Sequence, residues 1–95
     1  MGATLNAASG MGGYTLTDRA TWINFQNKSN MSIITEKNDL LLNQYGIILV
    51  NPQKCPNVKV KNATKFINWI LSEKGQSFIK NFKIKNQNLF YPSKD

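Results

Sequence analysis

The stretch "FINWILSEKGQSFI", residues 66–79, lies in the most strongly helical part of the chain. Apolar residues recur there at spacings of three and four, the pattern of helices that each bury one face. Asn62 and Ser72 are the expected N-caps, and Gly75 falls in the first turn of the second helix. We therefore expect two helices that meet at a bend. Their apolar positions are Ala63, Phe66, Ile67, Ile70 and Leu71, then Phe78, Ile79 and Phe82.

The segments before these helices favour extended structure. The run "YGIILVNP", residues 45–52, is almost wholly apolar and ends at Pro52, which is typical of a buried strand. The shorter run "MSIIT", residues 31–35, predicts a second strand that faces the first across a polar connection. Tyr14–Leu16 is also rich in residues that favour strands. Strands with flanking helices indicate an α/β fold.

The stretch "GGYTLTDR", residues 12–19, separates two helix-compatible segments, "TLNAAS" (4–9) and "RATWINFQN" (19–27). Its glycines allow backbone conformations that end the first helix, while Thr17 and Asp18 are both good N-caps for the second helix. A helix start also presents free N–H groups and a partial positive charge that attract anions. Residue types alone favour ordinary capping over an anion site.

Composition excludes most enzyme classes. The chain of 95 residues has no histidine, one cysteine (Cys55) and only five carboxylates, so it cannot build Ser-His-Asp or Cys-His catalysis or an imidazole metal site. We expect no enzymatic activity, no cofactor and no metal. The longest apolar run, residues 46–50, is far shorter than the ~20 residues of a membrane-spanning helix.

The net charge of +7 admits an anionic partner. The lysines are spread widely among asparagines, a pattern that favours a solvated surface over a nucleic-acid interface. A small basic nucleic-acid-binding domain remains the alternative, with Trp22, Trp69, Tyr45 and Phe90 as candidate stacking groups. A chain that only oligomerises is a third reading.

Four stretches together resemble one known family: "YTLTDRATW", "NQYGIILVNPQKCP", "FINWILSEKGQSFI" and "LFYP", in this order. They look like the C-terminal part of the tungstate-binding subunit of an ATP-binding-cassette (ABC) importer, a type II periplasmic binding protein. The resemblance implies that residues 1–95 are a single α/β fragment lacking the N-terminal lobe. Residues 1–41 would belong to the second ligand-binding lobe and the hinge approach, and residues 42–95 would supply a crossing strand and the C-terminal helices.

The resemblance also implies a site. Thr15 is the first candidate to donate a hydroxyl hydrogen bond to the oxyanion, followed by Tyr14 and Thr17. Arg19 either binds the anion or pairs with Glu36 or Asp39, and the ion pair is favoured.

Partners and location follow from the same resemblance. The implied partners are tungstate or molybdate in the full-length protein and the permease subunits of the importer, with no nucleic acid. The protein would be periplasmic or an extracytoplasmic lipoprotein. The fragment by itself is expected to bind an oxyanion weakly or not at all, and it can self-associate.

Overall fold

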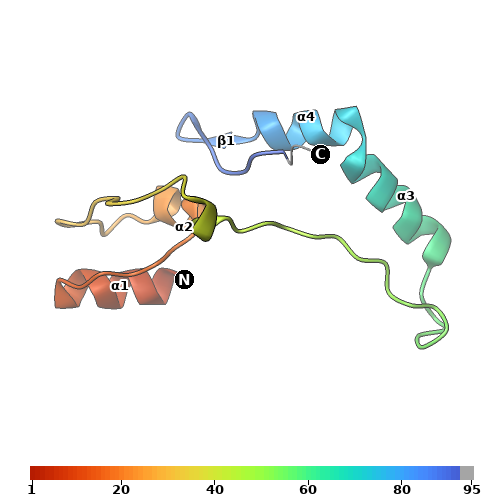
Figure 1. The fold of residues 1–95 in the computed structure, drawn as a ribbon, viewed down its shortest axis with the longest axis horizontal. Coiled ribbons are helices and arrows are strands. Elements are labelled where there is room, and N and C mark those ends of the chain that lie inside the picture. Colours follow the sequence, from red (N-terminus) through yellow and green to blue (C-terminus); the bar gives the residue numbers. More distant parts are fainter. Residues whose placement is uncertain (93–95) are drawn as a thin grey trace. The chain divides into compact units, whose positions relative to one another are not determined.

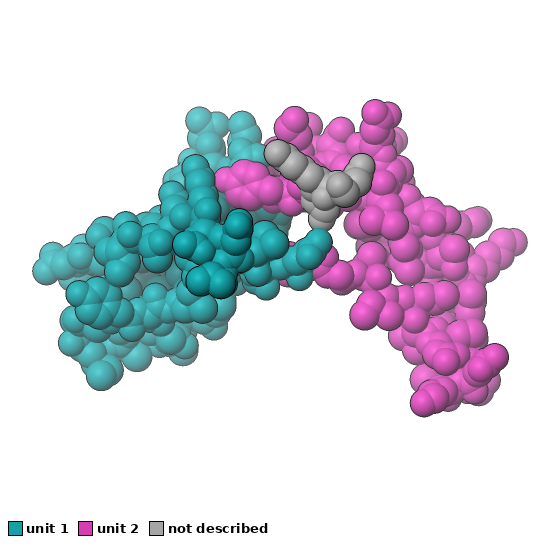
Figure 2. Space-filling model, viewed as in Figure 1, with its two compact units in different colours: residues 1–44, 83–90 teal, residues 45–82, 91–95 magenta. Residues whose placement is uncertain are grey.

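The computed structural model describes residues 1–92 and contains short helices joined by long irregular segments (Figure 1). The chain divides into two compact units, which are described separately. Unit 1 comprises residues 1–44 and 83–90, and unit 2 comprises residues 45–82 together with the segment that begins at Tyr91 (Figure 2). Residues 93–95, the end of the predicted 42–95 segment, lie outside the described residues.

Unit 1 contains helices α1 (Gly2–Met11) and α2 (Arg19–Asn24), the 3-10 helix η1 (Asp39–Leu41) and a small hairpin. Helix α1 confirms the predicted first helix but extends beyond Gly10. It ends at Gly12, whose φ of 65° is left-handed, and the N–H of Gly13 donates to the Ala8 carbonyl. Only glycine adopts this conformation without steric cost, so the glycine pair ends the helix.

The hairpin of unit 1 consists of β1 (Lys83–Ile84) and β2 (Gln87–Asn88), with Lys83 opposite Asn88 and Ile84 opposite Gln87. The two residues between the strands, Lys85 and Asn86, have φ of 50° and 60°. Positive φ at both central positions is the geometry of the tight turn that matches strand twist.

Unit 2 contains helices α3 (Val60–Leu71) and α4 (Glu73–Asn81). The predicted pair of helices and the bend between them are confirmed. Ser72 caps α4 as expected, since its Oγ accepts from the Gly75 N–H at 3.1 Å. The predicted Asn62 cap is wrong: α3 begins earlier, after Lys59, and has no side-chain cap. Residues 58–60 already form a backbone bond from the Val60 N–H to the Val58 carbonyl, so the chain turns before Asn62.

The predicted strands at 14–16, 31–35 and 45–50 are not formed. Among residues 1–92 the only paired strands are β1 and β2. An extended segment becomes a strand only when a neighbour accepts its backbone hydrogen bonds, and the described residues supply no such neighbour to these three segments.

The hydrophobic core is small and lies in unit 1. Leu89, near the C-terminus, is buried in this core, whereas Tyr91 is exposed. Within the described part of the chain no helix has the length and apolarity needed to cross a membrane. The buried apolar residues are Leu5, Ala8, Ile23, Phe25 and Leu89.

Candidate functional site

The predicted site residues lie on the connection between α1 and α2 and at the first residue of α2. Tyr14 is 91% exposed, with its ring in solvent, while Thr15 and Thr17 are half-buried. Arg19 is the first residue of α2. The connection therefore brings three hydroxyls and a guanidinium into one short segment, although Tyr14 makes no hydrogen bond within the described residues.

The two threonine hydroxyls donate to nearby backbone carbonyls, and Thr17 Oγ1 also donates to Met1 Sδ at 4.0 Å. Thr15 Oγ1 donates to the Leu16 carbonyl at 3.4 Å, and Thr17 Oγ1 donates to the Asp18 carbonyl at 3.3 Å. Both bonds are longer than the usual hydroxyl hydrogen bond and thus weak. A better acceptor brought close to these hydroxyls would replace the backbone carbonyls at little cost.

Asp18 occupies the N-terminus of α2. Its carboxylate accepts from the Thr21 N–H at 2.7 Å, so the expected capping role of Asp18 is confirmed. The hydrogen bonds with Thr21 hold the pKa of the Asp18 carboxyl below its ordinary value, because they stabilise the charged form. An ionised carboxylate at this point repels an anion, so the start of α2 is filled by the chain's own cap.

Arg19 forms an ion pair with Glu36. Its Nη2 lies 2.7 Å from Glu36 Oε2, and both side chains are partly exposed. The favoured prediction for Arg19 is confirmed, with Glu36 as the partner. The hydrogen bond and positive charge of Arg19 lower the pKa of Glu36. The guanidinium thus already binds a carboxylate, and an oxyanion would have to compete with it.

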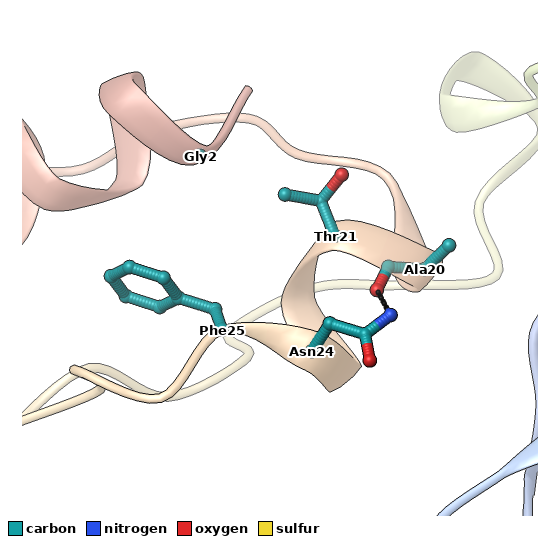
Figure 3. A pocket seen from close by; sticks show the side chains of 5 residues that line it. All are labelled: Gly2, Ala20, Thr21, Asn24 and Phe25. Carbon is teal, nitrogen blue, oxygen red and sulfur yellow. Dashed lines mark hydrogen bonds between the residues drawn. The ribbon is translucent and has the colours of Figure 1, made fainter.

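A hollow of about 430 Å³ lies beside this connection, but none of the predicted site residues lines it. Its walls come from the start of α1, from α2 and from Phe25, and Figure 3 shows Thr21 and Phe25 directed toward the side on which Gly2 lies. Asn24 Nδ2 donates to the Ala20 carbonyl at 3.1 Å. The spacing of Thr21 and Asn24 on one turn of helix was the sequence signal for this wall. Its lining residues are Gly2, Ala20, Thr21, Asn24 and Phe25.

Both tryptophans make contacts within their own units. The Lys28 ammonium lies 4.9 Å from the centroid of the Trp22 ring, a cation–π distance. The rings of Trp69 and Phe78 are 5.8 Å apart and tilted, an ordinary arrangement for packed aromatics. In addition, no group of three or more residues able to hold a metal ion occurs in residues 1–92.

The connection between α1 and α2 is irregular, short and rich in hydroxyls, and the strand-like segments that follow it are unpaired within the described residues. The PBP superfamily domain matches residues 1–74, and the chain belongs to this superfamily. Its α/β class agrees with the helices and the small hairpin of the structure.

Three relatives make the similarity more specific. The tungstate-binding protein TupA of Campylobacter jejuni is 40% identical over 92 residues, which cover 93% of this chain and 34% of that protein. The protein of the same name from Peptoclostridium acidaminophilum is 46% identical over 79 residues, covering 83% of this chain and 28% of its own length. A putative ABC transporter anion-binding protein of Haloferax volcanii is 35% identical over 98 residues, which cover 98% of this chain and 29% of that protein.

The chain thus spans about one third of the length of the curated relatives it matches. No solved structure matches it.

Proposed function

We propose that this chain is part of the solute-binding subunit of an ABC importer for tungstate or a molybdate-like oxyanion. The observation that carries the proposal is the similarity to two proteins named as tungstate-binding, at 40% and 46% identity along most of the chain. The relative named as an anion-binding protein of an ABC transporter supports the same ligand class. A binding subunit of this kind performs no catalysis.

The chain would form the C-terminal part of the binding protein and lack its N-terminal lobe. Matches that cover about one third of each relative support a partial chain, while the C-terminal placement rests on the resemblance of its four sequence stretches to that part of the family. Residues 1–41 would contribute to the second lobe and hinge, and residues 42–95 would supply the crossing strand and C-terminal helices. The complete subunit would work outside the cytoplasm, as a periplasmic protein or a lipoprotein, and would deliver its ligand to the permease.

Neutral donors would bind the oxyanion. Thr15, Tyr14 and Thr17 carry hydroxyls on one segment, and the two threonines donate weak bonds to nearby carbonyls and, from Thr17, to Met1 Sδ. Hydrogen bonds to a charged acceptor are roughly twice as strong as neutral ones, so exchange toward an oxyanion is favourable. Arg19 would join the site if it left Glu36 when the two lobes close. Closure requires that the ligand bind the closed form more tightly than the open form.

Calorimetric titration with tungstate, molybdate and sulfate tests the proposal. The titrations use this chain and, in parallel, a longer protein that carries it together with the matching N-terminal region. Tight binding of tungstate or molybdate by the longer protein, with sulfate much weaker, is the expected result. The chain by itself should bind weakly, because a site with one wall leaves the anion hydrated. A longer protein that binds none of the three anions would refute the ligand assignment.

A further inference from the structure

The last turn of α2 is bound by a lysine from a distant part of the chain. Lys85 Nζ donates a partly buried hydrogen bond to the Ile23 carbonyl at 3.3 Å, across 62 positions of sequence. Lys85 lies in the turn between β1 and β2. Both partners belong to unit 1, so the bond joins the hairpin to α2 within one compact unit.

A second lysine binds at the same end of α2. Lys28 Nζ donates to the Phe25 carbonyl, and its ammonium also lies over the Trp22 ring. The last carbonyls of a helix have no partner within the helix and carry partial negative charge, so cations beside them are stabilising. The two lysines therefore stabilise the end of α2 that lies opposite the Asp18 cap.

Helix α2 depends on such contacts because it is short. It has six residues, Arg19–Asn24, whereas isolated helices shorter than about 12–15 residues are marginal in water. Burial of Ile23, which is 4% exposed, and the bonds at the two ends of the helix therefore decide whether it forms. Loss of the Lys85 bond would leave the last turn of α2 with one contact fewer and favour its fraying.

Fraying of α2 would reach the predicted site residues. In an α-helix the N–H of residue 23 bonds to the carbonyl of residue 19, so Ile23 and Arg19 belong to the same turn. The Arg19 guanidinium lies 2.7 Å from Glu36 Oε2, and Thr17 directly precedes the Asp18 cap. A change at the end of α2 is thus passed to both residues within little more than one turn of helix.

We propose that Lys85 is a positioning residue for the oxyanion site: its hydrogen bond to the Ile23 carbonyl holds α2 in place, and α2 in turn holds Thr17 and Arg19. The ligand in this inference rests on the proposed function. The hold of Lys85 on α2 and on the Arg19–Glu36 ion pair does not, and it is measured without any anion.

Lys83 separates positioning from a general effect of charge. It lies on β1 of the same hairpin, two residues before Lys85, and is exposed. Its ammonium makes no hydrogen bond within the described residues, so it contributes charge but no contact with α2. Lys83→Met and Lys85→Met remove the same charge from the same hairpin and are matched variants. Lys85→Arg retains a cationic donor.

The first arm of the test uses the isolated chain without anion. Lys85→Met should speed amide exchange at residues 23–25 by about three- to tenfold, the effect of losing one hydrogen bond, while Lys85→Arg and Lys83→Met should leave it unchanged. Equal acceleration of exchange in α1 would mean that Lys85 acts on all of unit 1. That result would overturn the proposal.

The ionisation of Glu36 reports whether Arg19 has moved. The hydrogen bond and charge of Arg19 lower the pKa of Glu36, with a smaller effect from Lys37, which every variant keeps. In Lys85→Met the pKa of Glu36, measured by NMR titration, should rise toward its ordinary value, because a frayed α2 releases the guanidinium. A purely local role at Ile23 would leave this pKa unchanged and would overturn the proposal.

The second arm measures tungstate affinity by calorimetry in the longer protein. Lys85→Met should weaken binding by about three- to tenfold, because α2 must be ordered again when the anion binds. Lys85→Arg and Lys83→Met should stay within about twofold of the unmodified protein, as is usual for surface substitutions. Unchanged affinity in Lys85→Met, or an equal loss in Lys83→Met, would overturn the role of Lys85 alone. Absence of anion binding by the unmodified protein would instead refute the proposed function, and the positioning role at an oxyanion site with it.

Discussion

Asp18 shows how a single side chain defines the start of α2. Its carboxylate bonds the Thr21 N–H at 2.7 Å, and replacing such a cap by alanine costs about 0.5–2 kcal/mol. We expect Asp18→Ala to speed amide exchange at Thr21 by about two- to thirtyfold, the same range of free energy expressed as a rate. Asp18→Asn retains a capping oxygen and should change exchange little. Unchanged exchange in the alanine variant would contradict the capping role.

The same cap should respond to pH. The pKa of Asp18 is lowered from 3.8 in the folded chain, so the carboxylate contributes stability that is complete above pH 3.8 and is lost as the pH falls through the folded pKa. The protection factor of the Thr21 amide, followed from pH 7 to about 2, should fall only in the acid range. The Asp18→Asn variant should show no such step. Loss of protection near neutral pH would point to another group.

Thr15 and Thr17 offer the most direct residue-scale test of the site. Valine keeps the shape of threonine and removes the hydroxyl donor. A hydrogen bond to a charged group contributes about 1.5–3 kcal/mol, so Thr15→Val in the longer protein should weaken tungstate binding by about ten- to 150-fold. Thr17→Val should act in the same direction, and Thr4→Val on the exposed side of α1 serves as the control. Calorimetry measures the affinity of each variant for tungstate. An unchanged affinity would exclude the substituted threonine as a ligand.

Residues with local roles are the ones that sequence predicts best. Asp18 and Ser72 were predicted as caps because capping depends on groups within three residues of the cap. For Arg19 the sequence left two possible acidic partners, Glu36 and Asp39. The structure pairs it with Glu36, 17 positions away, and this contact depends on how the chain folds. The hollow beside Phe25 escaped prediction because its walls come from two consecutive helices, and the way these helices pack is not a local property of either sequence.

At the scale of elements, Gly75 fixes the junction between α3 and α4. A Cβ on Gly75 would lie 2.1 Å from the Trp69 carbonyl oxygen and 2.7 Å from that of Ile70. Both contacts are with backbone, which cannot move aside without opening the bend. We expect Gly75→Ala to destabilise the junction by about 1–3 kcal/mol or more, despite the better helix propensity of alanine.

Circular dichroism during thermal unfolding measures the effect of Gly75→Ala. Gly10→Ala is the matched control, since a Cβ on Gly10 within α1 meets nothing within 4 Å. Alanine there should stabilise the helix by about 0.5–1 kcal/mol. Similar changes in the two variants would mean that crowding at the junction has no energetic weight.

Helices and strands differ in how far sequence alone determines them. Helices α1, α2, α3 and α4 were all predicted, because a helix satisfies its backbone hydrogen bonds within itself and its caps are local. The segments at 31–35 and 45–50 have strand-like sequences yet form no ladder in the described residues. A strand requires a neighbour, and sequence pattern reports a residue's preference rather than the presence of that neighbour.

At the scale of the whole molecule, burial is unequal between the two units. Unit 1 buries five apolar side chains, whereas the apolar faces of unit 2 remain exposed. The stability that helices gain from packing an amphipathic face is therefore smaller for α3 and α4 in the chain by itself, where Ile67, Ile70 and Ile79 are only half-buried. The chain spans about one third of the length of its relatives, so the proposed function predicts that further polypeptide covers these faces.

The net charge of +7 provides the last prediction, because the two functional readings assign it different roles. If neutral hydroxyls bind the oxyanion, the lysines only speed encounter, and the affinity of the longer protein for tungstate should change less than about threefold between about 50 mM and 500 mM NaCl. A nucleic-acid binder would instead lose affinity by orders of magnitude over this range, because bound phosphates release counterions. Titrations of tungstate by calorimetry and of a single-stranded oligonucleotide by fluorescence of Trp22 and Trp69 compare the two directly. A steep loss of oxyanion affinity with salt would assign the ligand to Arg19 or the lysines rather than to Thr15.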